Sequence, residues 1–266
     1  MDFSDFDFVN FGPYVDLAQI LLYLFWAFFA YLLFYIQKET RREGYPLESD
    51  ETGAVVNHGV IYMPDAKVFK LPHGHGDVAL PDYKRESRKL NLEPSEPWSG
   101  APKDPTGSNP MLDGVGPGAW AERADVPDQM WSGEVKIKPM RVADVYAIPS
   151  GDPNPIGGEV KGCDDAVGGT VVDVWVDKAE SVIRYYEIKV SDDPKVRTVL
   201  MPANFAVVRT KPETHLYVDA ITGSQFADVP LTKDPETITM LEEEKIMGYY
   251  GAGFFYAMPD RANPLV

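Results

Sequence analysis

The sequence predicts a single N-terminal transmembrane α-helix, followed by a mostly antiparallel β domain with a short C-terminal helix. Three observations indicate this fold class: one long uncharged apolar stretch near the N-terminus, a series of short β-like runs from about residue 134 onward, and a helix-capping pattern after them. We expect an N-terminal tail at residues 1–12, a membrane helix at 13–37, an extended Pro/Gly-rich segment at 38–110, and the β domain with its helix at 111–266.

The membrane helix is predicted from residues 17–36, LAQILLYLFWAFFAYLLFYI, which carry no charge and only one strongly polar side chain, Gln19. Twenty residues at a rise of about 1.5 Å each span about 30 Å, the thickness of the hydrocarbon core of a bilayer. The preceding residues are acidic and no small-residue cleavage site follows, so we expect a retained anchor and not a cleaved signal peptide. A buried helix of a soluble protein is the alternative, but apolar runs of this length are rare there.

The charges around this helix predict its orientation. No Lys or Arg precedes it, whereas Lys38, Arg41 and Arg42 follow it directly. Because cations gather at the cytoplasmic end of membrane helices, we expect the large C-terminal part to be cytoplasmic. The same three side chains are candidate contacts for lipid headgroups, although they could also serve only to fix the topology.

The segment after the helix is dense in Pro, Gly and charged residues and has few apolar runs. This composition favours an extended chain that lies on partner proteins, with a flexible linker as the alternative. The stretch YMPDAKVFKLP alternates enough to form one short strand. Phe69 and Trp98 are large apolar residues that a partner surface would bury.

Six runs in the C-terminal part have the pattern of short strands: EVKIKPM, GGTVVDVWVD, SVIRYYEIKV, VRTVLMP, FAVVRT and HLYVDA. Six such strands predict a small barrel or a pair of packed sheets. After them, Thr239 and Glu242 form a capping box for a short helix, which Gly248 or Gly251 can end. We interpret the run of acids at 242–244 as favourable charge at the N-terminus of that helix.

Composition and motifs exclude several classes of function. A net charge of -16 disfavours nucleic-acid binding, which depends on cations that neutralise phosphates. The single cysteine, Cys163, excludes an intramolecular disulfide and a Cys-cluster zinc site. We find no phosphate-binding glycine loop, nucleophile elbow or zincin spacing, so an enzyme is disfavoured. His73 and His75 have no evident third ligand nearby, and we expect a solvated turn there instead of a metal site.

Two acids stand out in the turn between two predicted strands. Asp177 and Glu180 lie three positions apart in VVDVWVDKAESVIRYYEI. Two nearby carboxylates interact as a coupled pair, and partly buried acids of this kind can pass protons at physiological pH. The alternative is a pair of solvated acids that keep the protein soluble, and the turn alone does not decide between the two.

Eight motifs follow the predicted N-terminal membrane helix in this order: REGYPLE, LPHG, PTGSNPMLDGVGPGAWAER, KIKPMRVA, NPIGG, VVDVWVD, RYYEI and LEEEKIMGYYGAGFFYA. With this helix and these motifs, the chain resembles along nearly its whole length the H subunit of the purple bacterial photosynthetic reaction centre, in which they occur in the same order. Eight motifs in order, with the helix in the right place, make the resemblance specific. Residues 48–100 match the family only in patches.

The resemblance implies a subunit without pigment or catalytic activity of its own, with a cytoplasmic PRC-barrel. Its helix would lie beside the L and M subunits and its β domain would cap them, shield the quinone sites and help protons reach the secondary quinone. The implied location is the bacterial inner, photosynthetic intracytoplasmic membrane, with the N-terminus periplasmic. The complex would hold bacteriochlorophyll, bacteriopheophytin, quinones and non-haem iron, with carotenoid as a further candidate. Antenna polypeptides, a cytochrome subunit and membrane lipids are further candidate partners.

The resemblance also implies roles for individual residues. The acidic relay residues of the family lie in the WVD motif and three positions later, which match Asp177 and Glu180. Arg184, in IRYYE, is expected to tune these acids by favouring their ionised forms.

One departure from the family concerns the proton entrance. Some members carry surface histidines just before KIKPM, where this chain has MWSGEV. Glu134, or Asp125 and Asp128, are the candidates for the entrance, since a negative surface concentrates protons locally. Two alternatives stay open: a structural cap without the relay, and a membrane-anchored PRC-barrel adaptor that binds another cytoplasmic protein and has no photosynthetic role.

Overall fold

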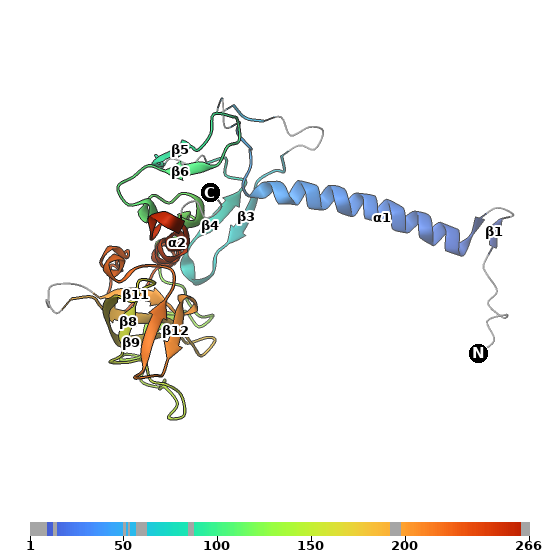
Figure 1. Ribbon diagram of the computed structural model, residues 1–266. Coiled ribbons are helices and arrows are strands. Elements are labelled where there is room, and N and C mark those ends of the chain that lie inside the picture. The colour runs from blue at the N-terminus through green and yellow to red at the C-terminus, as the bar shows by residue number, and fades with distance from the viewer. Residues whose placement is uncertain are drawn as a thin grey trace, which may run out of the picture. The chain divides into compact units, whose positions relative to one another are not determined.

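The computed structural model describes residues 10–12, 15–49, 52, 54–56, 63–84, 88–191 and 198–261. The chain forms two compact units, Met1–Ser87 and Arg88–Val266 (Figure 1). Most of the predicted N-terminal tail lies outside the described residues. Its described part, β1 (Asn10–Gly12), pairs antiparallel with β2 (Val15–Asp16).

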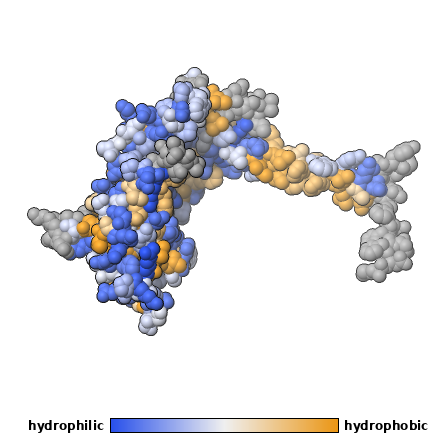
Figure 2. Space-filling view, in the orientation of Figure 1, coloured by the Kyte–Doolittle hydropathy of each residue, from blue (hydrophilic) through white to orange (hydrophobic). Residues whose placement is uncertain are grey.

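The first unit contains the membrane helix α1, Leu17–Glu39. It begins at Leu17 because Asp16 caps it, accepting a hydrogen bond from the Gln19 backbone N–H at 2.7 Å. The side chain of Gln19, the one strongly polar residue of the apolar stretch, donates a hydrogen bond to the Tyr23 hydroxyl at 3.0 Å. Hydrophobic side chains cover most of the visible surface of α1 (Figure 2). Among the described residues, α1 is the one helix long and apolar enough to cross a membrane.

The end of α1 is tied to a β-hairpin in the same unit. Strands β3 (Lys67–Lys70) and β4 (Asp77–Leu80) pair antiparallel, and His73 and His75 lie exposed at their turn. The Arg42 guanidinium donates to the Glu39 carboxylate, to the Asp65 carbonyl at 2.7 Å and to the Leu80 carbonyl at 3.0 Å. The Arg42 side chain therefore joins the helix to the region just before β3 and to the last residue of β4.

The second unit is built around a seven-stranded sheet with the order β11-β10-β9-β8-β13-β12, and with β7 paired to β9. All pairs are antiparallel except β13 with β8. The strands are β7 (Ile137–Pro139), β8 (Glu159–Lys161), β9 (Val167–Asp177), β10 (Val182–Lys189), β11 (Val199–Pro202), β12 (Ala206–Arg209) and β13 (His215–Val218). The six predicted runs correspond to six of these strands, and β8 is the addition. A separate hairpin, β5 (Leu92–Pro94) with β6 (Lys103–Pro105), precedes the sheet.

The core of the second unit lies between the sheet and the C-terminal helix α2, Met240–Tyr256. Trp175 and Tyr185 from the sheet and Ile246 and Tyr250 from α2 are buried in one apolar cluster. Short 3₁₀ helices complete the chain: η2 (Thr40–Arg42), η3 (Pro72–Gly74), η4 (Pro110–Leu112), η5 (Gly116–Gly118), η6 (Ala203–Phe205), η7 (Gly223–Asp228) and η8 (Pro259–Arg261).

The start of α2 agrees with its sequence pattern, but its end does not. The predicted capping box is present: the Thr239 hydroxyl accepts from the Glu242 N–H at 3.1 Å, and the Glu242 carboxylate accepts from the Thr239 N–H at 2.9 Å. The prediction that Gly248 or Gly251 ends the helix is wrong, because α2 continues to Tyr256. These glycines permit close packing instead: a Cβ at Gly248 would lie 2.8 Å from the Gly118 carbonyl oxygen.

One charged cluster is built into the sheet. Asp173 and Glu187 lie directly opposite each other on β9 and β10, and each is only 6% exposed. Arg141 lies between them and donates to Asp173 at 2.9 Å and to Glu187 at 2.5 Å. Trp175 Nε1 and the Thr198 hydroxyl also donate to Glu187, at 3.0 and 2.7 Å. The backbone N–H groups of Arg141 and Val174 donate to Asp173, so one guanidinium and four neutral donors surround the two buried acids.

Candidate functional site

The Asp177 carboxylate closes the turn in which the two predicted relay acids lie. Its Oδ1 accepts hydrogen bonds from the backbone N–H groups of Ala179 at 2.9 Å and Glu180 at 3.1 Å. The Asp177 side chain is 1% exposed, whereas Glu180 is exposed. The structure therefore brings the two acids into one turn but gives them different environments, one buried and one open to solvent.

The cation paired with Asp177 is Lys136, which sequence reasoning did not single out. Its Nζ lies 3.4 Å from Asp177 Oδ2 and 3.6 Å from Asp128 Oδ2. The position follows from β7, because the adjacent Ile137 pairs with Asp177 in the sheet. Partial burial lowers the pKa of Lys136, but the negative charges of Asp177 and Asp128 outweigh this effect and raise its pKa.

The three candidate entrance acids occupy different positions. Asp128 is joined through Lys136 to the buried Asp177. Glu134 pairs with Lys178 at 2.6 Å, and this hydrogen bond holds its pKa below the usual value. Asp125 pairs with Lys233, whose hydrogen bond lowers the pKa of the carboxyl; the Thr239 hydroxyl also donates to it, at 2.9 Å. Two candidates are thus connected to the relay turn: Asp128 through Lys136, and Glu134 through Lys178, which lies within the turn.

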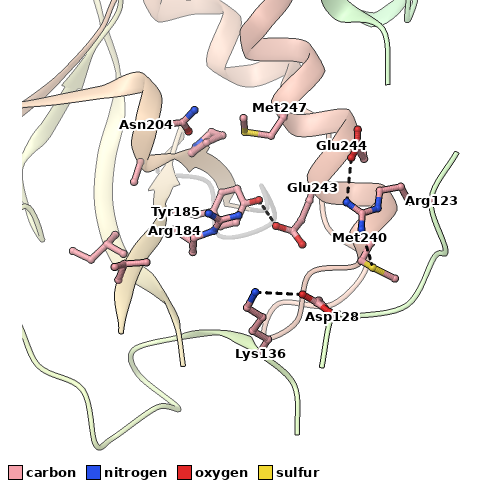
Figure 3. Close-up of a pocket in the computed structure, with 14 residues that line it drawn as sticks. Arg123, Asp128, Lys136, Arg184, Tyr185, Asn204, Met240, Glu243, Glu244 and Met247 are labelled. Carbon is pink, nitrogen blue, oxygen red and sulfur yellow. Dashed lines mark hydrogen bonds and ion pairs between the residues drawn. The ribbon is translucent and has the colours of Figure 1, made fainter. Parts of the chain in front are cut away.

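Asp128 and Lys136 also line a cleft of about 690 Å³ in the second unit (Figure 3). Its other walls come from β10, from η6 with the end of β11, and from the first two turns of α2. Arg184 and Tyr185 of β10 face Glu243 of α2 across it (Figure 3). The cleft therefore carries acidic and basic side chains and has room for ordered water.

The three acids at the start of α2 have separate roles. Glu242 belongs to the capping box, and Glu244 pairs with Arg123 at 3.5 Å. Glu243 lies in the cleft, where the Tyr185 hydroxyl donates to its carboxylate at 2.7 Å. Burial raises the pKa of Glu243, although Tyr185 and the positive charge of Arg184 oppose this. The interpretation of this run as helix N-terminal charge thus missed a cleft residue.

Comparison with known families agrees with this structure. Residues 9–142 match the family described as the N-terminal region of the photosynthetic reaction centre H chain, which is half of the sequence. The chain belongs to the photosynthetic reaction centre H-chain family. Residues 150–225 also match the PRC-barrel domain, a range that includes strands β8 to β13 and the turn with Asp177 and Glu180.

This H subunit is a non-enzymatic component of a complex with other reaction-centre subunits, and α1 provides its membrane anchor. The predicted fold class is confirmed: one apolar N-terminal helix, a mostly antiparallel PRC-barrel domain and a C-terminal helix. The role of Arg184 in tuning Asp177 and Glu180 stays a prediction. Arg184 does influence Glu243, whose pKa it lowers.

The cations at the C-terminal end of α1 and just after it have different surroundings. Arg42 is bonded to Glu39 and to two backbone carbonyls, so it serves as a structural tie. Arg41 lies over the ring of Tyr45, with 5.8 Å between the guanidinium carbon and the ring centre. Lys38 is in the last turn of α1. Contacts of these side chains with lipid headgroups stay a prediction.

Proposed function

We propose that this H subunit caps the L and M subunits on the cytoplasmic side of the photosynthetic intracytoplasmic membrane, shields the quinone sites, and relays protons to the secondary quinone through Asp177 and Glu180. The observation that carries the relay is the series Asp128–Lys136–Asp177. It leads from a surface acid to a carboxylate that is 1% exposed, with distances of 3.6 and 3.4 Å.

The chemistry of the quinone supports this proposal. A doubly reduced quinone takes up two protons, yet its pocket has to stay shielded from bulk water. A series of carboxylates with ordered water between them satisfies both demands. Asp177 is buried as a shielded site requires, and Glu180 lies at the exposed end of the same turn.

The proposed assembly also includes an orientation of the chain in the membrane and a set of cofactors for the complex. With Lys38, Arg41 and Arg42 on the cytoplasmic side, the N-terminus lies in the periplasm. Bacteriochlorophyll, bacteriopheophytin, quinones and non-haem iron belong in this proposal to the complex and not to this chain alone. Carotenoid, antenna polypeptides, a cytochrome subunit and membrane lipids are additional proposed components.

The relay is tested by Asp177→Asn in the assembled complex. Asparagine keeps the side-chain oxygen that accepts from Ala179 and Glu180, so the turn is retained. It cannot carry a proton, so proton-coupled transfer of the second electron to the secondary quinone should slow by about tenfold or more. The first electron transfer should not change.

Flash-induced absorption changes measure both steps, and Asp152→Asn, at an exposed loop acid, is the matched control. Glu180→Gln should slow the same step. Unchanged second-electron kinetics in an intact Asp177→Asn complex would leave only a structural cap.

The cap itself is tested by purifying the tagged chain from native membranes in mild detergent. It should carry near-infrared pigment bands that bleach in light, and a colourless preparation from membranes with intact reaction centres would contradict the assembly.

A further inference from the structure

Glu243 is a titratable group in the cleft that the relay described above does not use. Glu242 belongs to the capping box of α2. The next residue, Glu243, directs its side chain into the cleft (Figure 3). Its carboxylate is partly buried, and Tyr185 Oη donates to it at 2.7 Å. Tyr185 is itself 2% exposed, so its hydroxyl is held in place by the core around its ring.

The groups that face Glu243 come from two other elements. From β10, the Tyr185 hydrogen bond and the charge of Arg184 favour its ionised form. From residues 123–136, Arg123 also favours the ionised form, whereas Asp128 opposes it. Burial is the largest effect and gives a net rise in the pKa of Glu243. The pKa of Tyr185 is also raised, chiefly by burial, so the tyrosine keeps its own proton.

The cleft joins this carboxyl to the relay. Glu243, Asp128 and Lys136 line the same space of about 690 Å³. Lys136 is paired with Asp177 at 3.4 Å on its other side. Water in the cleft therefore has access both to the Glu243 carboxyl and to the Asp128–Lys136 pair that leads to the turn.

We propose that Glu243, positioned by Tyr185, is a second proton-binding group of the cleft, which exchanges a proton with cleft water when the charge near the relay changes. In this step a hydronium in the cleft transfers its proton to a Glu243 carboxylate oxygen and becomes water, and Tyr185 stays an O–H donor. No electron is transferred. The link to quinone reduction rests on the proposed function, but the proton site itself does not.

The proton site is tested by infrared titration of the full-length chain in lipid nanodiscs. Difference spectra between about pH 5 and pH 9 report the C=O stretch of protonated carboxyl groups, whose ordinary pKa values lie near 4. Glu243→Gln should remove one C=O band that persists at pH values above those at which carboxyl groups ordinarily lose their proton. Tyr185→Phe should shift the frequency of that band by removing its hydrogen bond. Glu236→Gln, at an exposed glutamate before α2, is the matched control and should leave the band lost in Glu243→Gln unchanged.

The outcomes separate this inference from the proposed relay. If the spectra of Glu243→Gln and the wild type agree at pH values above the ordinary carboxyl pKa, the proton site is refuted whatever the quinone kinetics show. If the band is lost while Asp177→Asn has normal kinetics, the site stands and the relay fails. In the complete complex, Glu243→Gln should also lower light-induced proton uptake, measured with a pH-indicator dye.

Discussion

Replacing Arg141 by Met should strongly destabilise the second unit. The substitution keeps most of the side-chain length but leaves Asp173 and Glu187, each 6% exposed and opposite each other, without their shared cation. Removing one member of a buried ion pair costs about 3–5 kcal/mol. Because the Arg141 side chain is 39% exposed, water compensates for part of the loss, and we expect the lower end, about 3 kcal/mol.

For a unit of this size, about 1 kcal/mol corresponds to about 2–4 °C, so the Tm should fall by about 6–12 °C. The assay is thermal and urea unfolding of the full chain in detergent, followed by near-ultraviolet circular dichroism. Adding Asp173→Asn to Arg141→Met should restore at least about 1 kcal/mol, because one uncompensated charge is removed. Arg209→Met, at an exposed arginine over the Tyr217 ring, is the control and should cost less than about 1 kcal/mol. A loss below about 0.5 kcal/mol in Arg141→Met would refute the reasoning.

Two further predictions concern α2. Gly248→Ala should destabilise the second unit by about 1–3 kcal/mol in urea unfolding, because the new Cβ would lie 2.8 Å from the Gly118 carbonyl oxygen. This loss should exceed the gain from the better helix propensity of alanine. A more stable variant would contradict this close packing. Because burial raises the pKa of Glu243 above 4.5, its contribution to stability is complete below that value and is lost as pH rises through the raised pKa. As the pH rises from 4.5 through the raised pKa, the wild type should therefore lose stability relative to Glu243→Gln. Urea unfolding at a series of pH values measures this, and parallel curves of unfolding free energy against pH would count against the raised pKa.

Local signals in the sequence predicted α1 and six strands of the seven-stranded sheet. An uncharged apolar run defines a membrane helix by itself, and the alternating runs around Trp175 and Tyr185 define a hairpin without distant information. Strand β8 was missed because its partners β13 and β9 are brought to it only by the complete sheet. Gly248 misled the prediction because a helix-ending glycine and a close-packing glycine look the same in sequence.

The candidate site shows the same limit. The turn spacing and the family resemblance placed Asp177 and Glu180 together, but the burial of Asp177 depends on its pairing with β7. Lys136 becomes its partner through that pairing, over a separation that no local pattern reports. Glu243 does lie in the first turn of α2, as its interpretation as helix N-terminal charge expects. Its place in the cleft was not predicted, because it depends on Tyr185, far away in sequence. The missed contacts are those that depend on tertiary structure.

The bonds of Arg42 have a mechanical consequence for the membrane anchor. A helix whose apolar length exceeds the bilayer thickness tilts to fit it. The guanidinium connects the last turn of α1 to the carbonyls of Asp65 and Leu80, and Lys67 also reaches Glu39 at 3.2 Å. The joint between anchor and hairpin is therefore stiff, and a change of tilt rotates the β3–β4 hairpin with the helix. We therefore expect a change in lipid thickness to change the orientation of the β3–β4 hairpin.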